Sequence, residues 1–122
     1  DMLTCARLPE TVHVEPRPVV VVEGILVLTD PRLREMMDVK VYVDADADDR
    51  LIRVITRDCI ERGRTPQMVI DRYVDTLKPM HELYIEPTKK CADLIIPQGG
   101  HNEVAVRLLT DYIRSLLPHD AR

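Results

Sequence analysis

The sequence predicts an α/β fold in which a parallel sheet lies between two layers of helices, giving three layers. Residues 19–28 read Val-Val-Val-Val-Glu-Gly-Ile-Leu-Val-Leu, an apolar run with no polar face, which is typical of a strand buried on both sides. Shorter β-branched runs at residues 39–44 and 92–97 predict two further strands. Segments with helical spacing separate these runs, and such alternation indicates parallel strands with right-handed crossovers.

Composition restricts the function of the chain. Its 122 residues suffice for one domain with a modest core. The net charge of −4 argues against a general nucleic-acid binder, and no apolar run approaches the ~20 residues of a membrane span. Cys5, Cys59 and Cys91 lie far apart without metal-binding spacing, so we expect free thiols in a cytoplasmic protein that binds neither nucleic acid nor membranes.

Glu23 interrupts the central apolar run near the point where the strand would end. A buried carboxylate is costly unless its charge is used, and open α/β sheets bind ligands beyond the carboxyl ends of their strands. Glu23 could therefore hold Mg²⁺ or its water shell, or it could be a paired glutamate that caps a neighbouring helix. The sequence leaves both interpretations open.

Local signals predict two small elements around this run. Residues 11–15 alternate before Pro16 and predict a half-exposed edge strand. Asp30 and Pro31 are typical of an N-cap and a first helical position, and they predict a short helix through Met37.

A longer helix is predicted from about Asp48 to Glu61, and Gly63 ends it. Its apolar residues share one face; the arginines of the other face and of the helix end are Arg50, Arg53, Arg57, Arg62 and Arg64. A solvated surface is the usual explanation of such a stripe, but arginine also suits planar, bidentate phosphate recognition. Because like charges repel when nothing anionic is bound, the clustering favours a phosphate-binding surface.

The remaining helices have clear start signals. Thr65 and Pro66 predict the N-cap and first position of a long helix, which Pro79 should kink or break. A final helix is expected over residues 102–117. Three parallel strands leave open sheet edges, so the sheet is expected to be incomplete without further strands from an N-terminal half.

Several motifs occur in a fixed order. They are Val22-Glu23-Gly24-Ile25-Leu26, Val43-Asp44-Ala45-Asp46-Ala47-Asp48, Arg57-Asp58, Glu61-Arg62-Gly63-Arg64, Lys78-Pro79, Glu86-Pro87-Thr88-Lys89-Lys90 and Ala92-Asp93-Leu94-Ile95-Ile96-Pro97. Each motif alone is weak, but the ordered set resembles the C-terminal half of the uridine kinase (uridine–cytidine kinase) family. This family belongs to the wider phosphoribulokinase/uridine kinase group of P-loop kinases. The resemblance extends from about Thr11 to Leu117.

This resemblance implies transfer of the ATP γ-phosphoryl group to the 5′-hydroxyl of uridine or cytidine, with Mg²⁺, in pyrimidine salvage. Residues 1–122 would be the C-terminal part of one P-loop kinase domain of the nucleoside and nucleotide kinase type. Its lid would lie at about residues 57–72 and its last strand and helix at 92–117. The P-loop motif is absent from the sequence. The phosphate cradle and the general base are therefore expected in the N-terminal half, and this chain alone is expected to be inactive. The resemblance also suggests a homo-oligomer.

The resemblance assigns roles to individual residues. Arg57 and Arg62 would be catalytic lid arginines on the ATP phosphates, and Glu23 would belong to the Mg²⁺ water shell. The expected nucleoside-binding residues are Ile25, Arg53, Arg64, Arg72 and Cys5. The expected ATP contacts near the adenine are Gly100 and Asn102.

Three positions depart from the family pattern. Val54 stands where the animal enzymes have a second arginine, Arg72 replaces a glutamine that contacts the sugar, and Cys5 falls where a histidine contacts the pyrimidine. These departures concern nucleoside recognition and leave phosphate binding intact.

Two other interpretations of the sequence compete with the kinase. A degenerate kinase-like module could bind an anionic ligand or a partner without catalysis, or the open sheet edge could pair with a separate chain. The arginines favour the enzyme, because a purely structural remnant has no evident use for them.

Overall fold

The computed structural model describes residues 6–98 and 102–117, so the expectations for Cys5 and Gly100 lie outside the described residues. In chain order the helices and strands are α1 (Pro31–Glu35), β1 (Val41–Val43), α2 (Ala47–Arg62), α3 (Pro66–Arg72), η1 (Tyr73–Leu77), α4 (Lys78–Met80), η2 (His81–Ile85), η3 (Glu86–Cys91), β2 (Leu94–Ile96) and α5 (Glu103–Leu116). η1 and η2 are π-helical turns, and η3 is a 3-10 helix.

The two shorter predicted strands form a parallel pair. Val41 is opposite Leu94 and Val43 is opposite Ile96, and the backbone N–H of Asp44 extends the pairing by donating to the carbonyl oxygen of Ile96 at 2.8 Å. Their apolar, β-branched sequences explain the pairing, because such side chains pack well on a pleated surface. The parallel α/β class is therefore confirmed. The full three-layer sheet is not, since the sheet formed by the described residues has two strands.

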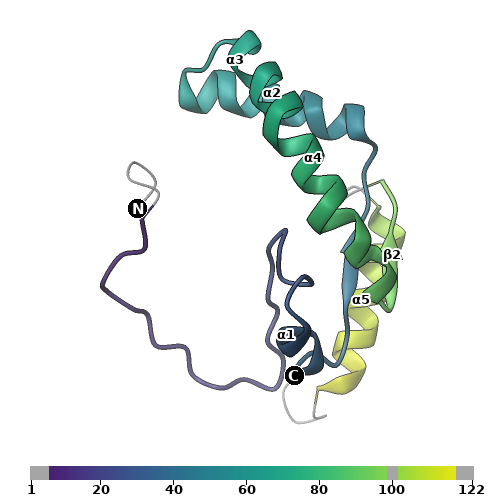
Figure 1. Cartoon of the computed structure of the whole chain (residues 1–122). Helices are drawn as coiled ribbons and strands as arrows, with labels where there is room; N and C mark the ends of the chain where they lie inside the picture. Colours follow the sequence, from purple (N-terminus) through teal and green to yellow (C-terminus); the bar gives the residue numbers. More distant parts are fainter. Residues whose placement is uncertain (1–5, 99–101, 118–122) are drawn as a thin grey trace.

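The expected central strand over residues 19–28 does not form. Residues 19–24 have no regular secondary structure, and residues 25–29 form a turn in which the N–H of Thr29 donates to the carbonyl oxygen of Leu26 at 3.0 Å. Val21 is 77% exposed. The physical reason is that a strand needs a hydrogen-bonded neighbour, and no described strand pairs with this run. The expected edge strand at 11–15 is absent for the same reason, and the segment before α1 is an extended arm (Figure 1).

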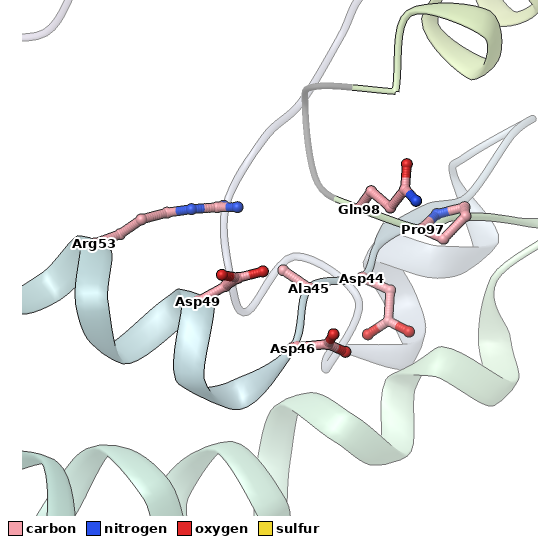
Figure 2. Close-up of a pocket in the computed structure, with 7 residues that line it drawn as sticks. All are labelled: Asp44, Ala45, Asp46, Asp49, Arg53, Pro97 and Gln98. Atoms are coloured by element: carbon pink, nitrogen blue, oxygen red, sulfur yellow. The ribbon is translucent and has the colours of Figure 1, made fainter.

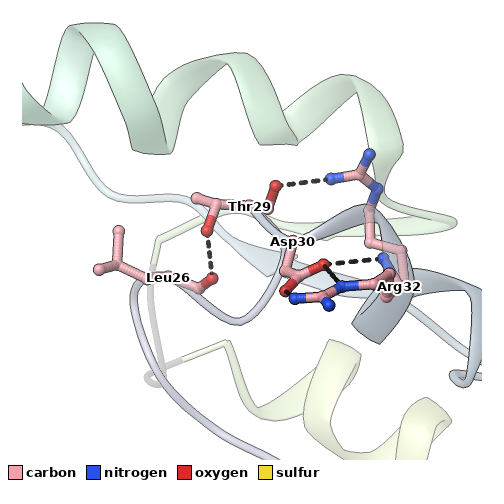
Figure 3. A network of polar contacts seen from close by, with 5 residues as sticks. Leu26, Thr29, Asp30 and Arg32 are labelled. Atoms are coloured by element: carbon pink, nitrogen blue, oxygen red, sulfur yellow. Dashed lines mark hydrogen bonds and ion pairs between the residues drawn. The ribbon is translucent and has the colours of Figure 1, made fainter.

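Helix α1 begins as the sequence predicts. The carboxylate of Asp30 accepts a hydrogen bond from the backbone N–H of Arg32 at 2.9 Å, and Pro31 occupies the first turn. The guanidinium of Arg32 also pairs with Asp30 at 3.0 Å, as Figure 3 shows. Arg34 donates to the carbonyl oxygens of Leu28 and Thr29 at 2.7 and 3.1 Å, and these hydrogen bonds from the helix stabilise the preceding turn.

A nearly continuous helical segment runs from α3 to η3 (Figure 1). Thr65 caps it by accepting from the N–H of Met68 at 3.3 Å. The helical segment continues through Pro79, so the expected break at this proline does not occur. Instead, α4 around Pro79 is flanked by the π-helical turns η1 and η2, and the N–H of Lys78 donates to the carbonyl oxygen of Tyr73. Wider helical turns beside a proline accommodate the backbone N–H donor that the helix lacks at that residue.

The buried core of the described residues is small. Its apolar members are Leu28, Tyr42, Val69 and Ile96. Cys59 and Cys91 carry free thiols, as expected. Within residues 6–98 and 102–117, no helix has the length and apolar character needed to cross a membrane.

Candidate functional site

Three arginines converge on one buried carboxylate near the end of α2. Asp58 is 2% exposed. Its Oδ1 atom accepts from the Nε of Arg57 at 2.9 Å and lies 3.1 Å from a guanidinium nitrogen of Arg62. Its Oδ2 atom accepts from Arg64 at 2.7 Å. We call these four residues the arginine cluster.

The backbone at the end of α2 makes this convergence possible. Gly63 adopts the left-handed conformation with φ 61°, which reverses the chain just after Arg62. The N–H groups of Gly63 and Arg64 both donate to the carbonyl oxygen of Asp58, the second at 3.1 Å. Asp58 therefore organises the turn through its main chain and the arginines through its side chain.

The electrostatics of the cluster favour anions. Burial alone would raise the pKa of Asp58, but the hydrogen bond from Arg57 and the charges of Arg57, Arg62 and Arg64 outweigh it and hold the pKa below its ordinary value. One carboxylate thus faces three guanidinium groups, which leaves an excess of positive charge. The arginine side chains keep exposures of 46%, 35% and 32%, so they remain accessible to an anion.

Asp58 has a role here that the motifs of the sequence do not predict. Clustered arginines predict an external anion, whereas Asp58 supplies an internal counter-ion. The signal was present in the sequence, because Arg62 follows Asp58 at the i,i+4 spacing of helical ion pairs. A structural use for these arginines therefore exists, so the feature that favours anion binding is the excess of three guanidinium groups over one carboxylate, and not the presence of arginines alone.

The other arginines of the α2 stripe lie elsewhere. Arg50 contacts the ring of His81, and burial together with the charge of Arg50 holds the pKa of His81 below its ordinary value. Arg53 lines an open pocket of about 550 Å³ at the carboxyl ends of β1 and β2 (Figure 2). The other residues lining that pocket are Asp44, Ala45, Asp46, Asp49, Pro97 and Gln98. The predicted stripe thus divides among three environments.

A second polar network fixes η3 against β1. Lys89 pairs with Asp44 at 2.6 Å and lies 5.7 Å from the centroid of the Tyr42 ring. The hydroxyl of Tyr42 donates to Glu86 at 3.2 Å. Burial and the charge of Glu86 raise the pKa of Tyr42, whereas the hydrogen bond to Asp44 raises that of Lys89. The partners satisfy one another, which is typical of a structural network.

The remaining predicted site residues are dispersed. Glu23 lies in the irregular segment, and Ile25, which is 76% exposed, lies in the following turn. Arg72 ends α3. Asn102 caps α5 by accepting from the N–H of Ala105 at 3.0 Å, and its amide group donates to the carbonyl oxygen of Pro97 at 3.3 Å.

The described residues contain no group of three or more His, Cys, Asp or Glu side chains arranged to hold a metal ion.

Fold and site together define an α/β protein with a cationic cluster suited to phosphate groups. A family model described as "Phosphoribulokinase / Uridine kinase family" matches residues 3–105. The chain therefore belongs to the phosphoribulokinase/uridine kinase family, as the resemblance predicted.

Individual relatives agree with this family. The chain is 57% identical to a uridine kinase of Lactiplantibacillus plantarum over 111 residues, which cover 91% of this chain and 53% of the relative. It is 55% identical to a uridine kinase of Bacillus subtilis over 115 residues, which cover 94% of this chain and 54% of the relative. A uridine kinase of Clostridium perfringens is 54% identical over 111 residues, 91% of this chain and 53% of the relative. The chain thus spans about half the length of the curated relatives it matches.

Proposed function

We propose that this chain is the C-terminal part of an ATP-dependent uridine or cytidine kinase that acts in pyrimidine salvage in the cytoplasm. The observation that carries the proposal is the arginine cluster, which holds three guanidinium groups around one buried carboxylate. Phosphoryl transfer depends on positioning and on neutralising charge, and an excess of fixed guanidinium charge supplies both. Identity of about 55% to proteins named uridine kinase supports the choice of reaction.

The cluster suggests a division of roles. Arg57 and Arg62 would contact the ATP phosphates, because both share Oδ1 of Asp58 and keep partly exposed guanidinium groups. Arg64 lies on the other carboxylate oxygen and would reach the nucleoside. Bidentate guanidinium contacts suit non-bridging phosphate oxygens, which supports this assignment.

Mg²⁺ would be held partly by Glu23. Mg²⁺ keeps several waters and commonly binds through one or two carboxylates together with substrate phosphates, so a single exposed carboxylate is compatible with it. When bound with ATP, the ion would neutralise charge on the phosphates. Glu23 would then orient the water shell of the ion.

The acceptor pocket would include Ile25, Arg53, Arg72 and Cys5. Arg53 is the best supported of these, since it lines a pocket at the carboxyl ends of the two parallel strands, where α/β sheets bind ligands (Figure 2). Gly100 and Asn102 would lie near the adenine. The side chain of Asn102 already caps α5, so Asn102 would contribute to adenine binding by positioning the loop.

Residues supplied by the rest of a longer protein would complete the site. This chain would contribute the lid, the final strand and helix, and part of the nucleoside pocket. The P-loop and the general base would come from the part that the relatives have in addition, and the chain alone would be inactive. Assembly into a homo-oligomer is part of the same proposal.

The test is a kinase assay on the complete protein, meaning the full product of the open reading frame that contains this sequence. ADP release would be followed with ATP and Mg²⁺, with and without uridine or cytidine. Nucleoside-dependent ADP release supports the proposal. No release with any pyrimidine nucleoside would overturn it.

One specific observation favours the alternative, a module without catalysis. Because Asp58 supplies an internal counter-ion, the arginines can stabilise the end of α2 without any ligand. On this alternative, the complete protein would bind tripolyphosphate or a partner but would release no ADP, so the same assay separates the two functions.

A further inference from the structure

We propose that Asp58 is a positioning residue that holds Arg57, Arg62 and Arg64 so that their remaining N–H donors face the triphosphate of ATP and the acceptor nucleoside. This inference rests on the proposed kinase function and adds to it a residue with no assigned role. Asp58 does not itself contact the substrate, because it is 2% exposed and its oxygens are occupied by the arginines.

The geometry of the carboxylate separates the arginines into two groups. Oδ1 holds Arg57 at 2.8 Å and Arg62 at 3.1 Å, whereas Oδ2 holds Arg64 at 2.7 Å. The proposed phosphate contacts are thus on one oxygen and the proposed nucleoside contact is on the other. A single rigid carboxylate would thereby fix the spacing between donor phosphate and acceptor, which is the quantity that in-line transfer requires.

Positioning is needed because arginine side chains are long and flexible. An unrestrained guanidinium loses rotamer freedom when it binds phosphate, whereas one already held by a buried carboxylate has lost most of it beforehand. Each guanidinium also has more N–H donors than Asp58 can accept, so holding the arginines does not consume their capacity to bind an anion. The exposures of 32% to 46% agree with that capacity.

The backbone around Asp58 makes the support rigid. Its carbonyl oxygen accepts from Gly63 and from Arg64, so side chain and main chain of one residue fix both ends of the turn. Any residue at this position could make these main-chain bonds of the helix end, and they give the Asp58 side chain a fixed backbone from which to hold the arginines.

The experiment compares variants of the complete protein. Asp58→Asn keeps the size of the side chain and removes its charge, and Asp111→Asn is the matched control, because Asp111 pairs with Arg114 at an exposed site on α5. We expect Asp58→Asn to lower kcat/KM for ATP by at least about tenfold and the control to leave it unchanged. A double-mutant cycle with Arg62→Ala supplies a reading that a merely structural role would not move. In the Arg62→Ala background, we expect the effect of Asp58→Asn to shrink to less than about threefold.

Two results would overturn the positioning role while the wild type is active. One is an Asp58→Asn variant with wild-type kinetics, and the other is an effect of full size in both backgrounds. If the wild type turns over no nucleoside, the proposed function fails, and calorimetric binding of tripolyphosphate to the same variants decides the role of Asp58. There, Kd should rise at least about tenfold in Asp58→Asn, and an unchanged Kd would refute the role.

A variant that keeps the charge covers the case in which Asp58→Asn does not fold. Asp58→Glu moves the carboxylate by one methylene. A positioning role predicts loss of turnover with a melting temperature close to that of the wild type, whereas retained turnover would show that charge alone suffices.

Discussion

The buried carboxylate of Asp58 couples the positions of Arg57, Arg62 and Arg64. Three cations this close would repel one another without it, and an isolated buried carboxylate would be costly without them. The carboxylate and the arginines therefore offset each other's electrostatic cost, and a surplus of two positive charges remains to bind an anion.

Removing one arginine should impair the reaction more than the fold. We expect Arg57→Ala or Arg62→Ala in the complete protein to lower turnover by about 10²-fold, because cationic groups on a transferred phosphoryl contribute at that level. Steady-state ADP release measures this. The control is Arg114→Ala, which removes an exposed arginine that pairs only with Asp111 among the contacts described. Wild-type rates in both lid variants would refute the assignment.

The lowered pKa of Asp58 predicts a particular acid sensitivity. Because the pKa is lower in the folded state than its ordinary value of 3.8, the ionised carboxylate stabilises the fold above that value, and the stabilisation is lost as pH falls toward the folded-state pKa. Urea unfolding at about pH 6 and about pH 3 should show a steeper loss of stability for the wild type than for Asp58→Asn. Parallel losses in the two proteins would contradict the prediction.

The end of α2 depends on one backbone conformation. At Gly63, with φ +61°, an added Cβ would meet nothing within 4 Å, so alanine is opposed by the backbone conformation and not by a clash. We expect Gly63→Ala to lower the free energy of unfolding by about 1 kcal/mol and Gly63→Asn to lower it less. Exposed Glu61→Ala in the same helix should change it by less than about 0.5 kcal/mol. Urea denaturation checks all three, and an alanine variant as stable as the wild type would count against the turn.

Helices and paired strands were predictable where the signal is local. Asp30, Thr65 and Asn102 begin helices because each side chain satisfies nearby N–H groups. The strands around Val41–Val43 and Leu94–Ile96 were predictable from β-branched content.

What could not be predicted depends on partners outside the segment itself. The run at residues 19–28 has strand composition, but composition does not supply a neighbouring strand. The ion pair of Asp58 with Arg62 could be expected from their i,i+4 spacing, but the contact with Arg64 could not, since it needs the reversal at Gly63. The arginine identities were therefore found from sequence, and their common counter-ion was not.

In the complete protein, residues 19–28 should form an ordered strand. The chain spans about half the length of its relatives, and three valines of this run are exposed, Val20 at 64%, Val21 at 77% and Val22 at 60%. We expect the amides of residues 19–22 in the complete protein to exchange hydrogen on the order of 10³-fold more slowly than in the 122-residue chain alone, because they would be paired in a sheet. Hydrogen exchange measured by mass spectrometry tests this. Equally fast exchange in both proteins would show that no strand forms there.

The proposed kinase function requires that the γ-phosphoryl group of ATP reach a pyrimidine nucleoside. The most direct measurement is to incubate the complete protein with Mg²⁺, uridine and ATP labelled in the γ-phosphoryl group, and to follow the label. We expect label in uridine monophosphate, and a marked loss of that label in Arg62→Ala. Label that stays in ATP, or that is released only as inorganic phosphate with every pyrimidine nucleoside, would contradict it.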